Sequence, residues 1–371
     1  MPQQLIILGA SARAAAGSAR RAGFEPFSID LFADRDTAEL GPTVRIDDYP
    51  GGFIAALAAA PIAPWIYTGS LENYPQLVDR LVQLRPLWGN GGAALARVRD
   101  PWQLAAVLHE ANTSFPEISA DPPPVSAGNS WIRKPLRSGG GMGIRLATDC
   151  EVADESHYFQ RLIPGQSSSA LFCAVDGHGT FLGASRQLTG RDWGLKNPFL
   201  YVGNIAPLDA TDSEVAALMH LGQLLVASFG LVGLFGVDFI RAEDKIWVQE
   251  VNPRYTAAVE VVERATGIRT LHRPWSATAP TTATHSLGIR YHGKAVVYAP
   301  REISIPAQWG DHVHALNESA DWPIVTDLPR VGDVIERDKP ICTLFAEAES
   351  PGEVENLLRE RTRSLLKIAS A

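Results

Sequence analysis

Two apolar runs near the middle of the chain enclose acidic and amide side chains, and they constrain the protein more than any other stretch. Residues 237–240 (VDFI) and 246–251 (IWVQEV) are rich in strand-forming residues, and the polar segment between them is short enough for a hairpin. Glu250 and Asn252 leave an extended strand on the same face, and hairpin pairing brings Asp238 opposite them. Carboxylate and amide oxygens are the ligands that Mg²⁺ prefers in proteins. The stretch therefore predicts a magnesium site, with a surface hairpin of solvated acids as the alternative.

Arg254 lies just past the second run, next to Pro253, where its charge can neutralise a transferring phosphoryl group. The letters D-F-I and W-V-Q-E-V-N-P-R in this stretch resemble the metal-binding core of the ATP-grasp superfamily. By position, the resemblance implies that Asp238 and Glu250 are Mg²⁺ carboxylates and that Asn252 is a further metal ligand. It also implies that Arg254 is the catalytic residue that faces the reacting phosphate.

The composition excludes several classes of protein. With 371 residues, of which 46% are hydrophobic and 20% charged, the chain has enough apolar material for two or three globular domains. A formal net charge of -8 argues against a nucleic-acid partner, which is bound through surplus Lys and Arg. Three widely spaced cysteines, Cys150, Cys173 and Cys342, indicate neither a disulfide framework nor a zinc site. Because no stretch is apolar enough to cross a bilayer and the start lacks a basic signal region, we expect an unprocessed cytoplasmic protein without a membrane partner.

The first part of the chain alternates strand and helix patterns. The expected strands are 5–8, 27–30 and 64–68, and the expected helices are 11–22, 53–60 and 75–84. This order predicts a Rossmann-like domain with a parallel sheet over residues 1–95, ending near the glycine cluster 89–92. The first strand-to-helix turn lies where open α/β sheets bind ligands, so Ser11 and Arg13 are candidate contacts for a substrate anion. A plain tight turn fits these residues equally well.

A glycine-rich turn at residues 137–143 (RSGGGMG) follows an expected strand at 131–136. Its backbone N–H groups can close over phosphates as a flap, and an ordinary long hairpin is the alternative. Lys134 and these glycines resemble the ATP-grasp pattern I-x-K-P followed by G-G-x-G, in which the lysine touches a nucleotide phosphate. The resemblance implies nucleotide contacts at Lys134, Ser138, Gly139, Gly140, Gly141 and Gly143.

Two further basic residues compete for a phosphate contact. Asp100 and Pro101 predict a helix start, because Asp is a good N-cap and Pro fits the first helical position. ATP-grasp proteins often carry a basic residue just before this helix that reaches the nucleotide phosphates. We assign that role to Arg99, with Arg97 as the alternative.

The sequence YFQRLIPG at 158–165 resembles the strand that holds adenine in ATP-grasp proteins. The resemblance implies base contacts from Gln160, Arg161, Leu162 and Ile163. Family members commonly have a glutamate where Gln160 stands and another, which binds ribose, just after the glycine. This chain has Gln166 and Ser167 after the glycine, so the ribose contact is left unassigned.

Two segments near the expected metal site have more than one interpretation. Residues 190–202 are irregular and aromatic, which fits either a substrate loop or a surface loop. Residues 256–266 predict a helix, and its Glu260 and Glu263 either meet a cationic acceptor or are solvated.

The rest of the chain completes the domain organisation. A low-complexity linker at 276–284 follows the expected ATP-grasp domain, which we place at residues 96–275. Residues 285–371 predict a small β-rich C-terminal domain with a terminal helix, and this region resembles the C-terminal domain of ATP-grasp proteins related to biotin carboxylase.

The whole pattern resembles predicted ATP-dependent carboligases related to biotin carboxylase. The resemblance implies an α/β and α+β fold, with a Rossmann-like N-terminal domain, a two-lobed ATP-grasp core and a small β-rich C-terminal domain. It implies an ADP-forming carboxylate–amine ligase that uses ATP and Mg²⁺, accepts Mn²⁺ as a substitute, and forms an acyl phosphate from a small-molecule carboxylate. A homodimer and a role in methanofuran- or tetrahydromethanopterin-linked cofactor synthesis are compatible with it. A bicarbonate-using carboxylase and a non-catalytic nucleotide-binding protein are the alternatives.

Overall fold

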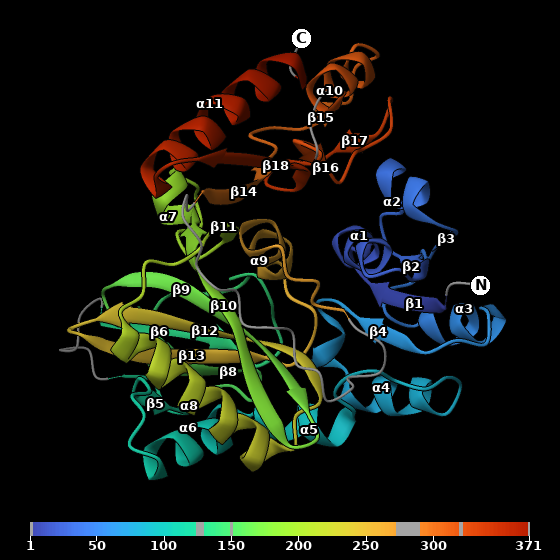
Figure 1. The fold of residues 1–371 in the computed structure, drawn as a ribbon. Coiled ribbons are helices and arrows are strands. Elements are labelled where there is room, and N and C mark those ends of the chain that lie inside the picture. The colour runs from blue at the N-terminus through green and yellow to red at the C-terminus, as the bar shows by residue number, and fades with distance from the viewer. Residues whose placement is uncertain (1–2, 124–129, 149–150, 272–289, 319–321, 370–371) are drawn as a thin grey trace.

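The computed structural model describes residues 3–123, 130–148, 151–271, 290–318 and 322–369 (Figure 1). The chain begins with a parallel sheet in the order β3-β2-β1-β4, so the predicted Rossmann-like arrangement is confirmed. Its strands are β1 (Gln4–Gly9), β2 (Glu25–Asp30), β3 (Thr43–Arg45) and β4 (Trp65–Tyr67), and its helices are α1 (Arg13–Arg21), α2 (Arg35–Leu40), α3 (Phe53–Ala59) and α4 (Pro75–Val82).

The apolar run in β1 is continuous because both faces of this sheet are covered. Leu5 and Ile7 pack in one cluster with the alanines of α1. Ile6 and Leu8 pack in a separate cluster with side chains of α3 and α4. A short 3₁₀ turn, η1 (Leu71–Asn73), follows β4.

Two helices and a small antiparallel sheet come next. The helices are α5 (Gly92–Val98) and α6 (Pro101–Glu110), and the strands are β5 (Ile118–Ser119), β6 (Trp131–Pro135), β7 (Arg145–Leu146) and β8 (His157–Arg161), in the order β5-β8-β6-β7. The predicted start of α6 is confirmed, because the Asp100 carboxylate accepts hydrogen bonds from the Trp102 and Gln103 amides. The glycine cluster 89–92 leads directly into α5. Gly92 begins α5, where its amide donates to Asp79 at 2.9 Å and an added Cβ would lie 2.5 Å from the Pro75 carbonyl oxygen.

The largest element is an eight-stranded sheet in the order β13-β12-β9-β10-β11-β14-β18-β16. Its strands are β9 (Gln166–Val175), β10 (His178–Thr189), β11 (Tyr201–Ala206), β12 (Gly233–Ala242), β13 (Lys245–Asn252), β14 (Tyr291–Tyr298), β16 (Val325–Thr326) and β18 (Pro340–Ala348). The loop expected at 190–202 contains the short helix α7 (Gly190–Trp193) and ends in the first residues of β11. A minor pair, β15 (Ile303–Ser304) and β17 (Val334–Ile335), lies outside the large sheet.

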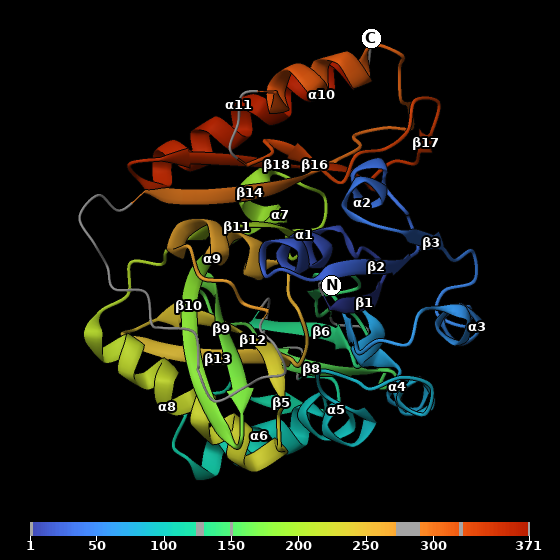
Figure 2. The same cartoon turned by 45° about the vertical axis from the view of Figure 1, so that its right-hand side comes forward.

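Helices cover both faces of the large sheet. Phe172 of β9 packs against α8 (Asp212–Phe229), whereas Leu171, its neighbour on the opposite face, packs in a cluster with α1 and α9 (Ala258–Thr266). At the other end, α11 (Pro351–Ala369) packs on β14 and β18, with α10 (Trp309–Asn317) nearby (Figure 2).

The C-terminal strands β14, β18 and β16 continue the same sheet that begins in the ATP-grasp region. The described structure therefore joins the predicted second and third domains through hydrogen bonds between β11 and β14. The predicted boundaries remain predictions, and the expected linker at 276–284 lies outside the described residues, as does Cys150. No helix in the described part of the chain is long and apolar enough to cross a membrane.

Candidate active site

The predicted hairpin is formed by β12 and β13, and it brings two acids face to face. Asp238 is paired with Glu250, and Asn252 lies opposite Gly236. The turn itself consists of Glu243 and Asp244, which have φ angles of 52° and 57°. Both adopt the left-handed conformation that suits a two-residue hairpin turn, so the polar connection is shorter than the five residues expected.

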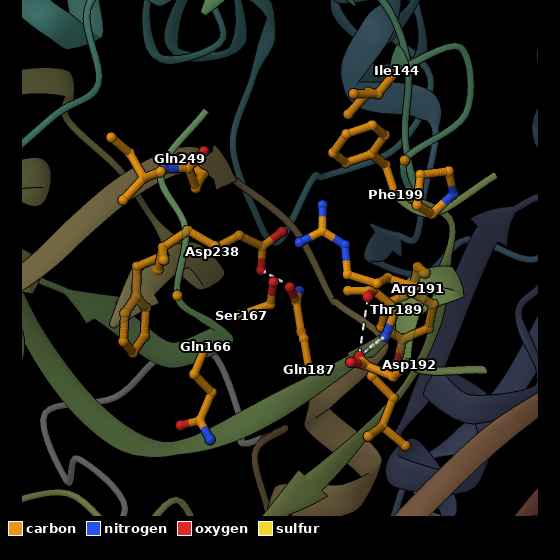
Figure 3. A pocket seen from close by; sticks show the side chains of 18 of the residues that line it. Ile144, Gln166, Ser167, Gln187, Thr189, Arg191, Asp192, Phe199, Asp238 and Gln249 are labelled. Atoms are coloured by element: carbon orange, nitrogen blue, oxygen red, sulfur yellow. Dashed lines mark hydrogen bonds between the residues drawn. The ribbon is translucent and has the colours of Figure 1, made fainter. Parts of the chain in front are cut away.

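Asp238 is held by two amide donors. Its carboxylate accepts hydrogen bonds from Gln187 Nε2 at 2.8 Å and from Asn252 Nδ2 at 2.9 Å (Figure 3). Burial, and then the negative charge of Glu250, raise the pKa of Asp238 to about 7. Two facing carboxylates repel each other when both are ionised, and a divalent metal ion bound between them would offset this repulsion.

Glu250 lies among cations that favour its charged form. Burial would raise its pKa, but Arg99, Lys134 and Arg254 outweigh burial and hold the pKa of Glu250 below its usual value. Arg99 Nη1 lies 3.4 Å from the Glu250 carboxylate.

The donor set fits a magnesium ion shared with phosphates. Across the described residues, no group of three or more His, Cys, Asp or Glu side chains could hold a metal by itself. Asp238, Glu250 and Asn252 supply oxygen atoms only, which leaves ligand positions for phosphate oxygens and water. Ligation by Asn252 requires its oxygen to turn toward the ion, because in this structure its amide nitrogen donates to Asp238.

The two arginines before α6, Arg97 and Arg99, reach different parts of the molecule. Arg99 reaches the site, where it donates to the backbone oxygens of Ser138 at 3.2 Å and Val251 at 3.3 Å. Arg97 instead donates to the Ser228 carbonyl and lies over the Phe229 ring, on the α8 side. This placement favours Arg99 as the phosphate contact.

A cavity of about 480 Å³ opens between the small sheet and the β12–β13 hairpin. Several residues predicted to hold the nucleotide or the metal line it, namely Lys134, Gly140, Gly141, Leu162, Ile163, Asp238 and Glu250. Gln187 of β10 and Arg191 of α7 also line it and point toward Asp238, whereas the Thr189 side chain, which lines it too, donates to Asp192 (Figure 3). Sequence reasoning did not place Gln187 and Thr189 in the site, because strand register alone decides which residues of β10 face the hairpin. Arg191 belongs to the segment 190–202, for which a substrate loop was one of the two interpretations.

The segment predicted to hold adenine begins as β8, and only its residues after the strand face the cavity. Leu162 and Ile163 line the cavity, whereas the Arg161 side chain lies over the Trp131 ring. Gln160 is fully buried beside the cavity wall, where its oxygen accepts a hydrogen bond from Lys134 Nζ at 3.0 Å. The Gln160 amide nitrogen has no hydrogen-bond partner among the described residues, and Gln160 does not line the cavity.

The glycine-rich turn forms a flap that lies against the segment before β11. The Tyr201 amide donates to the Gly140 carbonyl at 2.8 Å, and Asn197 Nδ2 donates to the Gly141 carbonyl at 3.1 Å. Gly140, Gly141 and Gly143 have φ angles of 62°, 77° and 74°. A Cβ at position 141 would lie 1.8 Å from the Phe199 carbonyl oxygen, so the close approach of the two segments requires glycine there.

Arg254 is held from the N-terminal region. Its guanidinium forms an ion pair with Glu72 at 2.6 Å and donates to the Tyr255 carbonyl at 3.1 Å. Glu72 lies in η1 and is 1% exposed. The sequence did not indicate Glu72, because its link to Arg254 spans the two domains and leaves no local pattern.

A second cavity, of about 410 Å³, adjoins the first. Both are lined by Gly140, Gln187, Tyr201, Asp238 and Glu250, so the acidic pair lies at their junction. Asn252 and Arg254 line the second cavity only. Its far walls come from the loops after β1 and β2 and from β14 and β18.

The predicted substrate contacts Ser11 and Arg13 also line this second cavity. Arg13 is already engaged, because both its terminal nitrogens bind Glu260, at 2.5 and 2.9 Å, and its Nε donates to Asp327 at 2.9 Å. At the start of α1, the Ala12 amide donates to the protein's own Asp30 carboxylate at 2.6 Å. The Asp30 carboxylate therefore already occupies part of the position where this helix start would bind an anion. A substrate contact by Ser11 or Arg13 remains a prediction.

The two acids of α9 are not solvated. Glu260 is 1% exposed and Glu263 is 3% exposed. Glu263 binds Arg21 at 2.5 Å and accepts hydrogen bonds from Ser18 and Thr270. The solvated alternative is therefore wrong, and both acids join α9 to other elements.

Comparisons with known proteins agree with this geometry. Residues 98–258 match a family model described as an ATP-grasp domain. An uncharacterized protein of Methanocaldococcus jannaschii is 22% identical over 235 residues, which are 62% of this chain and 54% of that protein, so the chain spans only about half of this curated relative. Biotin carboxylase of Campylobacter jejuni, solved with an ATP analogue, superposes with a TM-score of 0.70 at 14% identity, covering 98% of this chain and 94% of that one. L-amino acid ligase of Bacillus licheniformis superposes with a TM-score of 0.68 at 14% identity, covering 96% of each chain.

Proposed function

Because the chain belongs to the ATP-grasp superfamily, we propose that it is an ATP-dependent ligase that joins a carboxylate to an amine and releases ADP and phosphate. One observation carries this proposal. The acidic pair Asp238 and Glu250 lies at the junction of two cavities of about 480 and 410 Å³. This arrangement allows a nucleotide and a second substrate to meet at one metal-binding point.

The first cavity would hold ATP. Lys134 lines this cavity and would supply positive charge for the phosphates, and Arg99, beside Glu250, would add to that charge. The flap would supply backbone N–H groups above the phosphates. Asp238, Glu250 and Asn252 would hold Mg²⁺, which neutralises charge on the phosphate oxygens when it is bound. Mn²⁺ should serve as well, because it accepts the same oxygen ligands.

The second cavity would hold the carboxylate. A carboxylate oxygen forms a bond to the γ-phosphorus while the bond from that phosphorus to the β,γ-bridging oxygen breaks, and ADP leaves with the electron pair. The amine nitrogen then attacks the acyl carbon of the acyl phosphate, inorganic phosphate leaves, and the nitrogen loses a proton. Arg254, which lines this cavity, would neutralise charge on the transferring phosphoryl group.

The likeness to biotin carboxylase supports a second candidate function. In that case bicarbonate takes the place of the organic acid and carboxyphosphate replaces the acyl phosphate. A cytoplasmic location, a homodimer and a role in methanofuran- or tetrahydromethanopterin-linked cofactor synthesis are parts of the ligase proposal that rest on resemblance alone.

The test is ADP release from the purified protein with ATP, Mg²⁺ and a matrix of carboxylic acids and amines, with bicarbonate in a separate series. A ligase should release ADP only with particular acids, and hydroxylamine should trap the acyl phosphate as a hydroxamate. ADP release with bicarbonate alone would replace the ligase by a carboxylase. If neither series stimulates ADP release above that of Glu250→Gln, the protein is a nucleotide-binding protein without this activity.

A further inference from the structure

The second cavity is lined by two ionisable groups, the Lys294 amine and the Asp34 carboxyl group, that do not bind each other. Both residues line the cavity, and no ion pair joins them. Lys294 comes from β14, and Asp34 comes from the loop between β2 and α2. Neither position follows from the ATP-grasp motifs, because both elements lie outside the matched residues 98–258.

Lys294 is a buried ammonium group with too few acceptors. It is 4% exposed, and its nearest acid is Glu260 at 3.9 Å. Both oxygens of Glu260 already accept shorter hydrogen bonds from Arg13. Lys294 donates no hydrogen bond within the described residues, although burial of an ammonium group demands acceptors. Burial lowers the pKa of Lys294 to about 8, as expected for an ammonium group with too few hydrogen-bond acceptors.

Asp34 lies near three other acids, Asp30, Asp36 and Asp327. Unlike them, its carboxyl group has no hydrogen-bond donor among the described residues. Asp30 accepts from three backbone amides, Asp36 accepts from the Asp327 and Leu328 amides, and Asp327 binds Arg13. The Asp34 side chain forms neither a hydrogen bond nor an ion pair in the part of the chain that is described, and it does not cap α2. Burial, and then the neighbouring acids, raise the pKa of Asp34 to about 8.

The wall of the second cavity also has apolar parts. Its lining includes the Phe32 and Tyr298 rings and the apolar side chains of Val296 and Ile341. Phe32 is 49% exposed, which is unusual for a large aromatic side chain beside a cavity. A ligand that carries a carboxylate, an ammonium group and an apolar side chain would satisfy Lys294, Asp34 and these walls together.

We propose that this cavity binds an amino acid or a closely related zwitterion, with its carboxylate on Lys294 and its ammonium group on Asp34. The inference deepens the proposed function, on which it rests for the idea that the second cavity holds a substrate. It concerns binding, so it does not depend on which end of the zwitterion reacts.

The experiment is isothermal titration calorimetry of the full chain with each of the twenty common L-amino acids, in the presence of Mg²⁺ and ADP so that no turnover occurs. The tightest amino acid is then compared with its decarboxylated amine and its deaminated acid. Each analogue should bind at least about tenfold more weakly, because each leaves one buried charge without its hydrogen-bonded partner. Equal binding of either analogue, or no binding by any amino acid, would overturn the inference.

Two variants assign the contacts. Lys294→Met should weaken binding of the amino acid and the deaminated acid at least about tenfold and leave the amine unchanged. Asp34→Asn should weaken the amino acid and the amine and leave the deaminated acid unchanged. Lys367→Met and Asp47→Asn, at exposed positions, are the matched controls and should bind all three probes like the wild type. Losses that do not follow the ligand's charged groups would contradict the assignment, and the comparison of analogues on the wild type stands even if a variant fails to fold.

Failure of this inference and failure of the proposed function can be told apart. Zwitterion binding without any acid-stimulated ADP release would remove the ligase and keep the binding site. ADP release with acids that carry no ammonium group, together with no amino-acid binding, would keep the ligase and remove the zwitterion.

Discussion

At the scale of single residues, the site depends on acids whose surroundings differ although they face each other. Asp238 is held by amide donors, and its pKa is raised to about 7, whereas Glu250 lies among cations that lower its pKa. Glu250 is therefore the carboxylate that is ionised before any metal binds. This difference makes Glu250 the sharper target for mutation.

Glu250→Gln should lower ADP formation by on the order of a hundredfold or more, because it removes the ionised metal ligand and keeps the side-chain shape. Melting temperature and ADP release measure the effect on fold and on function separately. Glu243→Gln, in the exposed turn of the same hairpin, is the control and should behave as wild type. A Glu250→Gln protein that turns over at the wild-type rate would remove the metal assignment.

Arg254 is expected to act mainly on charge that develops in the transition state. Arg254→Ala should therefore lower kcat by about a thousandfold while the KM for ATP changes little. Arg254→Lys should restore little, because a single ammonium group cannot replace the guanidinium fork. Loss of ATP binding at unchanged kcat would instead make Arg254 a nucleotide clamp.

Glu72 should position Arg254 without touching the reacting atoms. Glu72→Gln leaves the buried guanidinium without its ion pair, so we expect the free energy of unfolding to fall by about 3 kcal/mol and kcat to fall at unchanged KM for ATP. Denaturant unfolding and steady-state kinetics measure the two effects. A loss of stability with normal kcat would show that Glu72 is structural only.

At the scale of elements, the flap and the segment before β11 form one unit. Two hydrogen bonds join Gly140 and Gly141 to Tyr201 and Asn197, and residues 139–143 should close over the phosphates when nucleotide binds. Backbone amides of 139–143 and 197–201 should therefore exchange more slowly with Mg²⁺ and ADP than without them. Equal exchange in both states would count against a phosphate-covering flap.

Gly141→Ala tests the same contact by mutation. The new Cβ would clash with the Phe199 carbonyl oxygen, so the flap should lose its contact with residues 197–201. ADP formation should then fall by at least about tenfold. Gly177→Ala is the matched control, because Gly177 has a φ of 79° and nothing within 4 Å of an added Cβ. It carries the backbone strain alone and should keep full activity.

At the scale of the whole molecule, buried ion pairs join three regions around the second cavity. Arg13 of α1 binds Glu260 of α9 and Asp327 from the C-terminal region. One turn further along α9, Arg264 lies over the rings of Trp322 and Phe345. The walls of the second cavity depend on these contacts, since its residues come from all three regions.

Arg13→Met should lower the free energy of unfolding by about 3 to 5 kcal/mol at neutral pH, because it leaves the buried Glu260 carboxylate and the partly buried Asp327 carboxylate without their partner. Burial opposes the charge of Glu260, but Arg13 outweighs burial and lowers the pKa of Glu260 to about 2. This stabilisation is present above pH 4.5, the ordinary value, and is lost as the pH falls toward 2. The variant should therefore show a weaker acid dependence in denaturant unfolding than the wild type. Arg35→Met, in an exposed pair with Glu39, is the control and should change stability little.

Local signals in the sequence determined much of the fold. The continuous apolar run at 5–8 predicted a strand, the Asp100–Pro101 pair predicted the start of α6, and the motif from Asp238 to Arg254 predicted the hairpin and its facing acids. These features depend on neighbouring residues and on the fixed periods of helix and strand, so one sequence suffices to recognise them.

Only the tertiary structure decided which distant residues complete the site. Glu72 meets Arg254, Gln187 meets Asp238, and Lys294 reaches the second cavity through strand order and register in the large sheet. The same packing engages Arg13 with Glu260 and buries an acid that a helix pattern alone would place in solvent. Such contacts depend on how separate elements pack, and a charged residue carries no mark in the sequence of the partner that packing brings to it.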